Sequence, residues 1–215
     1  AGAEGEEPVV KVDLKRELSG YAARRDVFDD VVLPPRRYAV IDGSGDPNTS
    51  ADYRDALATL FPFSFAVKFA SKRGLGRDYV VGPLEALWWA DDFTAFTSAR
   101  DPSAWSWRAM MVVPDWIRDD QLDLATTAAL EKDAPAIDRL RIDTLDEGRC
   151  IQTLHVGPYD DEGPVLAHLH DHVIPGKGLR MRGHHHEIYL GDPRRAAPEK
   201  LRTILRQPVT DAAGG

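Results

Sequence analysis

The sequence predicts an α+β fold in which two similar units build one curved antiparallel sheet. The order strand, turn, helix, strand, strand occurs twice, in residues 36–113 and again in residues 149–208. The two units share no sequence identity, so the prediction depends on the order of elements. Two such units side by side place their helices on one face of the sheet. The other face would then stay open, and a ligand groove is a reason for leaving it so.

Composition limits the class of protein. The 215 residues are 43% hydrophobic and 29% charged, which is typical of a soluble globular protein. The net charge of −8 argues against nucleic acid or an anionic membrane as partner. A single cysteine fits a reducing compartment, no apolar run approaches the roughly 18 residues of a spanning helix, and the acidic start is unlike a signal peptide. We therefore expect a cytoplasmic protein, and its oligomeric state stays open.

The ends of the chain offer little to bury. Residues 1–8 and 210–215 are therefore predicted to be disordered. Between them we expect a single domain over residues 9–209, with repeat one at about 36–116 and repeat two at about 148–209.

The first unit follows a short amphipathic helix expected within residues 11–23. Its first strand, residues 36–43, ends in a cluster of turn-forming residues. Thr49 or Ser50 can cap the helix that follows, in which apolar residues recur at steps of three and four. Pro62 lies inside this helix and is expected to kink or split it.

Two tryptophan-bearing strands complete the first unit, at residues 83–89 and 105–113. A helix over roughly 118–133 leads to the second unit. That unit is predicted to contain a strand at 148–156, a helix at 162–173, a strand at 185–190 and a last strand near 203–208.

All five tryptophans lie between Trp88 and Trp116, and four of them belong to the two strands just described. Indole rings favour planar or cationic guests, so this concentration indicates an aromatic pocket. Because side chains alternate along a strand, one of Trp88 and Trp89 must point away from the helices. The alternative is that the indoles only pack a core and its rim.

Glu187 shares a strand face with His185 and Tyr189. Desolvating a carboxylate among aromatic and apolar residues costs free energy unless it meets a cation, a donor or water. Glu187 can therefore neutralise a cationic guest or act as general base on a water molecule. The alternative is a glutamate on an exposed sheet face, and Glu85 is a weaker candidate by the same reasoning.

Other chemical signatures are sparse. His168 and His172 have the four-residue spacing of zinc ligands, and His185 or Glu187 is a conceivable third ligand. No cysteine pair and no metalloprotease glutamate accompany them, so we expect solvated histidines, no metal and no cofactor. The sequence also contains no phosphate-binding glycine loop and no nucleophile elbow. Cys150 is expected to be a buried structural thiol.

Several segments together resemble the GyrI-like small-molecule-binding family. They are Tyr38-Ala39-Val40-Ile41-Asp42-Gly43-Ser44-Gly45-Asp46-Pro47-Asn48, the strand at 83–89, His155-Val156-Gly157-Pro158-Tyr159, His185-His186-Glu187-Ile188-Tyr189-Leu190, Asp192-Pro193-Arg194-Arg195 and the closing segment 205–209. The resemblance spans about residues 10–209. It implies two units related by a pseudo-twofold axis with a groove between them, as in effector-binding domains of multidrug-responsive regulators. The implied ligands are hydrophobic, often planar and cationic, held by aromatic walls and by a glutamate that matches Glu187.

The chain looks most like a stand-alone subfamily that hydrolyses cyclopropane-bearing DNA alkylators. This resemblance implies that Glu187 orients or deprotonates a water molecule, while Tyr189 or Tyr159 hydrogen-bonds the substrate carbonyl. The predicted ligand-binding residues are Trp88, Trp89, Trp105, Trp107, Tyr38, Phe65 and His155. Two other functions stay open, a passive drug-binding or sequestering protein and, less favoured, a modulator of DNA gyrase.

Overall fold

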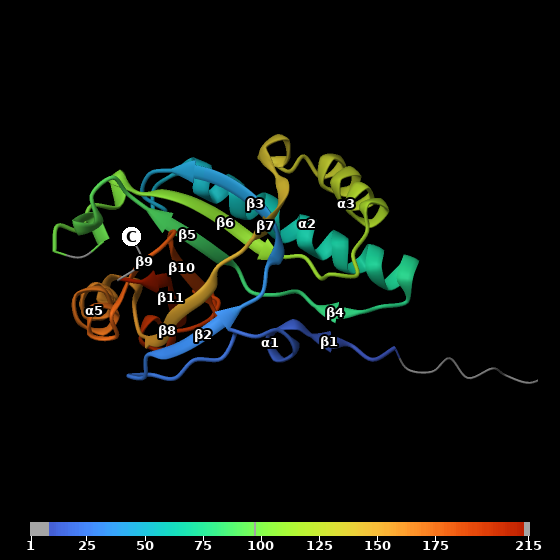
Figure 1. Ribbon diagram of the computed structural model, residues 1–215. Coiled ribbons are helices and arrows are strands. Elements are labelled where there is room, and N and C mark those ends of the chain that lie inside the picture. Colours follow the sequence, from blue (N-terminus) through green and yellow to red (C-terminus); the bar gives the residue numbers. More distant parts are fainter. Residues whose placement is uncertain (1–8, 97, 213–215) are drawn as a thin grey trace, which may run out of the picture.

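A computed structural model describes residues 9–96 and 98–212, so the predicted disorder of residues 1–8 and of residues 213–215 lies outside the described residues. Its main element is an open nine-stranded sheet (Figure 1). Eight strands follow one another from edge to edge, and each neighbouring pair is antiparallel. In spatial order they are β2 (Asp29–Leu33), β8 (Gly148–Val156), β11 (Arg202–Asp211), β10 (His185–Tyr189), β5 (Glu85–Trp89), β6 (Ser106–Val112), β3 (Arg36–Ser44) and β7 (Arg141–Leu145). The ninth strand, β9 (Leu179–Met181), pairs with the end of β11.

The strand order is symmetric about its centre, where β10 lies beside β5. Moving outward, β11, β8 and β2 on one side match β6, β3 and β7 on the other. This order confirms the predicted α+β fold of two repeats related by a pseudo-twofold axis. The sequence prediction missed the edge strands β2 and β7. It also ended the last strand too early, because Thr210 and Asp211 pair with β9 and are not disordered.

Helices cover one face of each unit. On the first unit lies α2 (Ala51–Leu75), against which α3 (Asp119–Glu131) packs. On the second lie α4 (Gly163–His168), the π-helical segment η5 (Leu169–Val173) and α5 (Ile174–Gly176). No helix of the described part of the chain is long and apolar enough to cross a membrane.

The expected helix over residues 11–23 is wrong in most of its length. Only α1 (Leu14–Glu17) is helical, since the residues before it form β1 (Val12–Asp13), which pairs in parallel with β4 (Tyr79–Val80). Gly20 then adopts a φ of 88°, which is incompatible with a continued helix.

The predicted N-terminal cap of α2 is Ser50, whose hydroxyl accepts a hydrogen bond from the backbone N–H of Tyr53 at 3.3 Å. Pro62 does not split α2, which continues to Leu75 and ends at Gly76 with a φ of 62°. A proline removes the helical hydrogen bond to the carbonyl four residues earlier, here Ala58. Ala58 and Pro62 both line the cavity described in the next section.

The face of the sheet opposite the helices is not open, contrary to the sequence prediction. The segment before β2 covers it and is held to the sheet through its backbone carbonyls. Arg36 donates to the carbonyl of Ser19 at 3.1 Å, Arg206 to that of Gly20 at 2.6 Å, and Gln152 to that of Ala22 at 3.0 Å. A non-periodic segment of this kind gives no signal in the sequence. The open space lies instead on the helix face.

Candidate functional site

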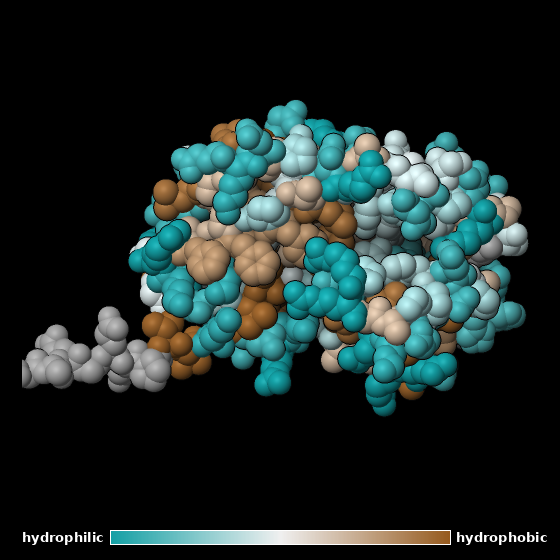
Figure 2. Space-filling model, turned by 180° about the vertical axis from the view of Figure 1, so that it is seen from behind, coloured by the Kyte–Doolittle hydropathy of each residue, from teal (hydrophilic) through white to brown (hydrophobic). Residues whose placement is uncertain are grey.

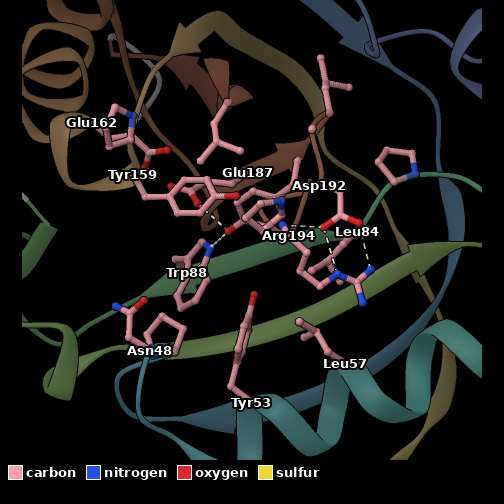
Figure 3. A pocket seen from close by; sticks show the side chains of 18 of the residues that line it. Asn48, Tyr53, Leu57, Leu84, Trp88, Tyr159, Glu162, Glu187, Asp192 and Arg194 are labelled. Carbon is pink, nitrogen blue, oxygen red and sulfur yellow. Dashed lines mark hydrogen bonds and ion pairs between the residues drawn. The ribbon is translucent and has the colours of Figure 1, made fainter. Parts of the chain in front are cut away.

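A cavity of about 1110 Å³ lies on the helix face, above the central strands β5 and β10. The side chains of Tyr53 and Leu57 extend from α2 towards the sheet, opposite Trp88 and Glu187 (Figure 3). The sides are enclosed by residues of η1 (Phe93–Phe96), η2 (Pro102–Ala104) and η4 (Tyr159–Asp161), by Arg100 and by the loop after β10. The space is therefore bounded by both repeats.

Apolar surface continues from the cavity to the outside of the molecule. The face turned to the viewer in Figure 2 has an apolar area bordered by hydrophilic residues. Phe65 and Phe69 of α2 are among the exposed apolar side chains, and Phe65 also lines the cavity. Phe65 thus joins the apolar lining of the cavity to the outer surface.

Glu187 lies at the sheet end of the cavity and is 8% exposed. Its strand partner across the β5–β10 pair is Ala86, which is buried in the core. Tyr189 donates its hydroxyl proton to Glu187 Oε2 at 2.6 Å, and Trp88 Nε1 donates to the Tyr189 hydroxyl at 2.9 Å. His185 Nε2 lies 3.2 Å from Glu187 Oε1. Both carboxylate oxygens are therefore held in place.

These contacts decide the charge of Glu187. Burial alone raises its pKa, but the hydrogen bond and charge of His185, with the Tyr189 hydroxyl, lower that pKa to about 2. Burial and the neighbouring Glu187 charge raise the pKa of Tyr189 well above its usual value. At neutral pH the cavity therefore contains a buried carboxylate beside a neutral phenol.

A second carboxyl, Glu162, adjoins Glu187 and was missed in the sequence. It directly precedes α4, lines the cavity and is 2% exposed. Burial and the Glu187 carboxylate, to which it is hydrogen-bonded, raise the pKa of Glu162 well above its usual range. In the sequence, Glu162 is the last of three consecutive acidic residues after Tyr159. The only signal for it was its position close to His155–Tyr159, one of the segments that resemble the GyrI-like family.

Six of the residues predicted for the site line the cavity: Glu187, Tyr189, Tyr159, Trp88, Trp105 and Phe65. Tyr159 and Tyr189 contact each other edge to face, with ring centroids 5.6 Å apart. Trp105 stacks on Phe96 at 5.2 Å, and the Arg100 guanidinium lies 5.0 Å from the Trp105 ring. The aromatic wall therefore comes from both sides of the pseudo-twofold.

Trp89 and Tyr38, which the sequence analysis predicted to bind the ligand, do not line the cavity. Both lie on the opposite face of the sheet because side chains alternate along each strand. There Trp89 stacks on His184 at 4.4 Å, and the Tyr38 hydroxyl faces Glu85 at 3.4 Å. The expectation that Trp88 and Trp89 point to different faces is confirmed.

Trp107 and His155 share the helix face with Glu187 but are also not part of the cavity lining. Trp107 is fully buried beneath Tyr53, with ring centroids 5.1 Å apart. His155 lies on β8, away from the central strands, and its Nε2 is 2.9 Å from the carbonyl of Pro158. Strand alternation gives the face on which a side chain lies, but not what covers that face. Which of these side chains reaches the cavity therefore depends on tertiary packing.

The remaining candidates do not gather into a metal site. Over residues 9–96 and 98–212, no group of at least three His, Cys, Asp or Glu side chains could hold a metal ion. The rings of His168 and His172 lie 5.4 Å apart on the helical segment. Cys150 is buried, and burial raises the pKa of its thiol to about 12.

A buried ionic network lies on the other face of the same central strands. His186 places Nε2 at 2.8 Å from Glu85 and Nδ1 at 2.7 Å from Glu147, while Arg206 donates to Glu147 at 3.1 Å. With a carboxylate at each ring nitrogen, His186 is an imidazolium. Burial opposes this charge, but Glu147 and Glu85 raise the pKa of His186. Glu85 is thus part of this network and not of the cavity.

An aromatic-walled cavity between two pseudo-symmetric repeats, with a buried carboxylate pair, defines a small-molecule-binding protein. The family model described as the GyrI-like small molecule binding domain matches residues 112–210. The chain belongs to the GyrI-like family.

Solved structures from Listeria innocua agree over nearly the whole chain. An uncharacterized conserved protein is 35% identical with a TM-score of 0.82, covering 93% of this chain and 100% of its own. Two proteins described as hydrolases are 34% and 33% identical, with TM-scores of 0.78 and 0.80. They cover 93% and 94% of this chain and 100% of their own. No curated protein sequence matches the chain.

Proposed function

We propose that this protein is a hydrolase that opens the cyclopropane ring of hydrophobic, planar DNA-alkylating compounds. The main support is the ionised Glu187 carboxylate, fixed by Tyr189 at 2.6 Å and His185 at 3.2 Å inside an aromatic cavity. Relatives described as hydrolases, 33% and 34% identical, add to it. The reaction would serve detoxification and drug resistance in the cytoplasm.

The substrate class is a cyclopropane joined to a cyclohexadienone. Glu187 accepts a proton from a water molecule, and the water oxygen forms a bond to the ring methylene. The strained carbon–carbon bond breaks, its electron pair moves into the dienone, and the carbonyl oxygen becomes a phenolate. Protonation of that oxygen gives a phenol with a hydroxymethyl-type arm, so the net change is addition of one water.

The surrounding residues orient the substrate and exclude bulk water. Trp88, Trp105 and Tyr53 offer flat faces or edges to a planar ring system. The Tyr189 hydroxyl already donates its hydrogen bond to Glu187. Tyr159, which also lines the cavity, is therefore the phenol that donates a hydrogen bond to the substrate carbonyl. Holding water and methylene in line beside the carboxylate reduces the entropic part of the barrier.

The test is turnover of a spirocyclopropane cyclohexadienone in ¹⁸O-labelled water, with products analysed by mass spectrometry. The wild-type protein is expected to give a ring-opened product with one ¹⁸O atom. Glu187→Gln keeps the shape of the side chain and removes the base, so the rate is expected to fall about 10²-fold or more. Glu131→Gln, an exposed glutamate at the end of α3, is the matched control. Absence of labelled product with the wild-type protein refutes the proposal.

A second candidate is a sequestering protein for hydrophobic cations. A buried anion in an aromatic cavity of about 1110 Å³ favours such guests. Here Glu187→Gln would lose affinity for a planar cation, measured by tryptophan fluorescence quenching, and no wild-type turnover would be seen. For the hydrolase, the same variant keeps its affinity for a neutral substrate and loses turnover.

A further inference from the structure

We propose that Glu162 is the proton donor of this site. We also propose that Glu187, after accepting a proton from water, returns a proton to Glu162 at the end of each reaction. The proposal rests on the proposed ring-opening function and adds the residue that protonates the departing oxygen. It starts from an orphaned polar atom. Glu162 Oε1 is buried and has no hydrogen-bond partner among the described residues, although Glu162 lines the cavity and is only 2% exposed.

A structural role does not explain Glu162. It occupies the position just before α4, where side chains often cap a helix, yet it makes no capping hydrogen bond. A buried ionised carboxylate with an unpartnered oxygen would be strongly destabilising. A neutral carboxylic acid whose hydroxyl donates to Glu187 avoids most of that cost.

The neighbouring groups determine which member of the pair keeps the proton. Glu187 accepts from Tyr189 and is contacted by His185, whereas Glu162 has no comparable donor. The groups that act electrostatically with Glu162 come from three elements: Glu187 and Tyr189 of β10, Arg100 between η1 and η2, and Tyr159 and Asp160 of η4. Of these Arg100 alone opposes protonation, while the Glu187 carboxylate favours it. Two adjacent carboxyls with different partners thus separate into an acid and a base.

The cycle balances for one water. Glu187 takes one proton from the attacking water and then no longer accepts from the Glu162 hydroxyl. That hydroxyl turns to the dienone oxygen and gives it the proton as the carbon–carbon bond breaks. The product leaves as a neutral phenol, Glu187 is protonated and Glu162 is ionised. The hydrogen bond between the two carboxyls then returns the proton to Glu162, so the resting state is restored without exchange with bulk water.

The first test compares wild type, Glu162→Gln and Asp161→Asn with the spirocyclopropane cyclohexadienone. Asp161 is the neighbouring exposed acid of η4 and does not line the cavity, which makes it the matched control. The turnover number of wild type and Asp161→Asn is expected to fall as pH rises through the elevated pKa of Glu162. Glu162→Gln is expected to lose about 10²-fold in turnover and this alkaline decline, while its affinity by fluorescence quenching stays within a few-fold. An unchanged turnover and pH profile in Glu162→Gln overturns the donor role.

The second test locates the proton without turnover. Infrared difference spectra of the ligand-free proteins at neutral pH are expected to contain the carbonyl stretch of a buried protonated carboxylic acid in wild type and Asp161→Asn. The band is expected to vanish in Glu162→Gln. Its absence from wild type, or its persistence in Glu162→Gln, overturns the assignment. If wild type shows the band but no turnover of any cyclopropane substrate, the hydrolase function fails while the proton assignment stands.

Discussion

Replacing Arg206 by methionine is expected to destabilise the protein strongly, although Arg206 lies outside the cavity. Its guanidinium is fully buried and donates to Glu147 at 3.1 Å, to Gln152 at 3.0 Å and to the carbonyl of Gly20 at 2.6 Å. Methionine keeps most of the side-chain volume. The change therefore tests charge and hydrogen bonding more than packing.

Two considerations bear on the size of the loss in stability. Removing one partner of a buried ion pair typically costs about 3–5 kcal/mol, because the other charge stays buried. Burial alone would raise the pKa of Glu147, but His186 and Arg206 lower it from 4.5 to about 2. That net difference corresponds to about 3 kcal/mol in favour of the ionised carboxylate, to which His186 and Arg206 both contribute. The variant should therefore lose a large part of the roughly 5–15 kcal/mol typical of a folded domain.

Urea unfolding at neutral pH measures the loss. Arg149→Met is the matched control, since Arg149 pairs with Asp30 at 2.7 Å on the surface, where an ion pair is worth about 0–1 kcal/mol. A free energy of unfolding for Arg206→Met that equals that of Arg149→Met would refute this account of the network.

The same network predicts that the free energy of unfolding has a maximum as a function of pH and falls at both lower and higher pH. Glu147 has a lowered pKa when folded, so its contribution is present above about 4.5 and is lost as pH falls towards 2. His186 has a raised pKa when folded, so its contribution is present below 6.5 and is lost as pH rises through the folded value. The unfolding free energy measured across pH should decline on both sides of this window, and a flat profile would contradict the ionic assignment.

Two further substitutions probe the site and its support. Trp88→Phe removes the indole N–H that donates to Tyr189 at 2.9 Å, and should cost about 0.5–1.5 kcal/mol in stability or transition-state binding, read from kcat/KM and urea unfolding. Gly43→Ala places a methyl group 2.3 Å from the buried Trp107 ring and should destabilise by about 1–3 kcal/mol, whereas Gly176→Ala, with nothing within 4 Å, should not. Equal stability of the two alanine variants would show that the Trp107 packing is not tight.

Local patterns were enough to predict the order of elements and part of the site. Strand alternation correctly separated Trp88 from Trp89 and put His185, Glu187 and Tyr189 on one face, because the period of two is a property of the strand itself. It could not predict that Trp107, on the same face as Trp88, is covered by Tyr53. That depends on where α2 packs, which no local pattern specifies.

The location of the cavity and of Glu162 depends on long-range contacts. The groove was expected on the bare face of the sheet, but Gly20 and its neighbours cover that face through backbone carbonyls that accept from Arg206 and Arg36. Glu162 follows two exposed aspartates in the sequence, and only the fold shows that its side chain turns inward beside Glu187. Neither contact leaves a periodic signal.

The consecutive residues His185, His186 and Glu187 explain why a costly ionic network lies behind the cavity. His185 and Glu187 lie on the helix face, where Glu187 lines the cavity, while His186 faces Glu85 and Glu147. A shift of one residue between β10 and β5 would move His186 into the cavity and Glu187 into the network, leaving charges unpaired on both faces. Apolar residues at these positions would tolerate that shift far better, even if they gave equal stability. The network therefore fixes the register of the central strands, and with it the position of the carboxylate on which the proposed chemistry depends.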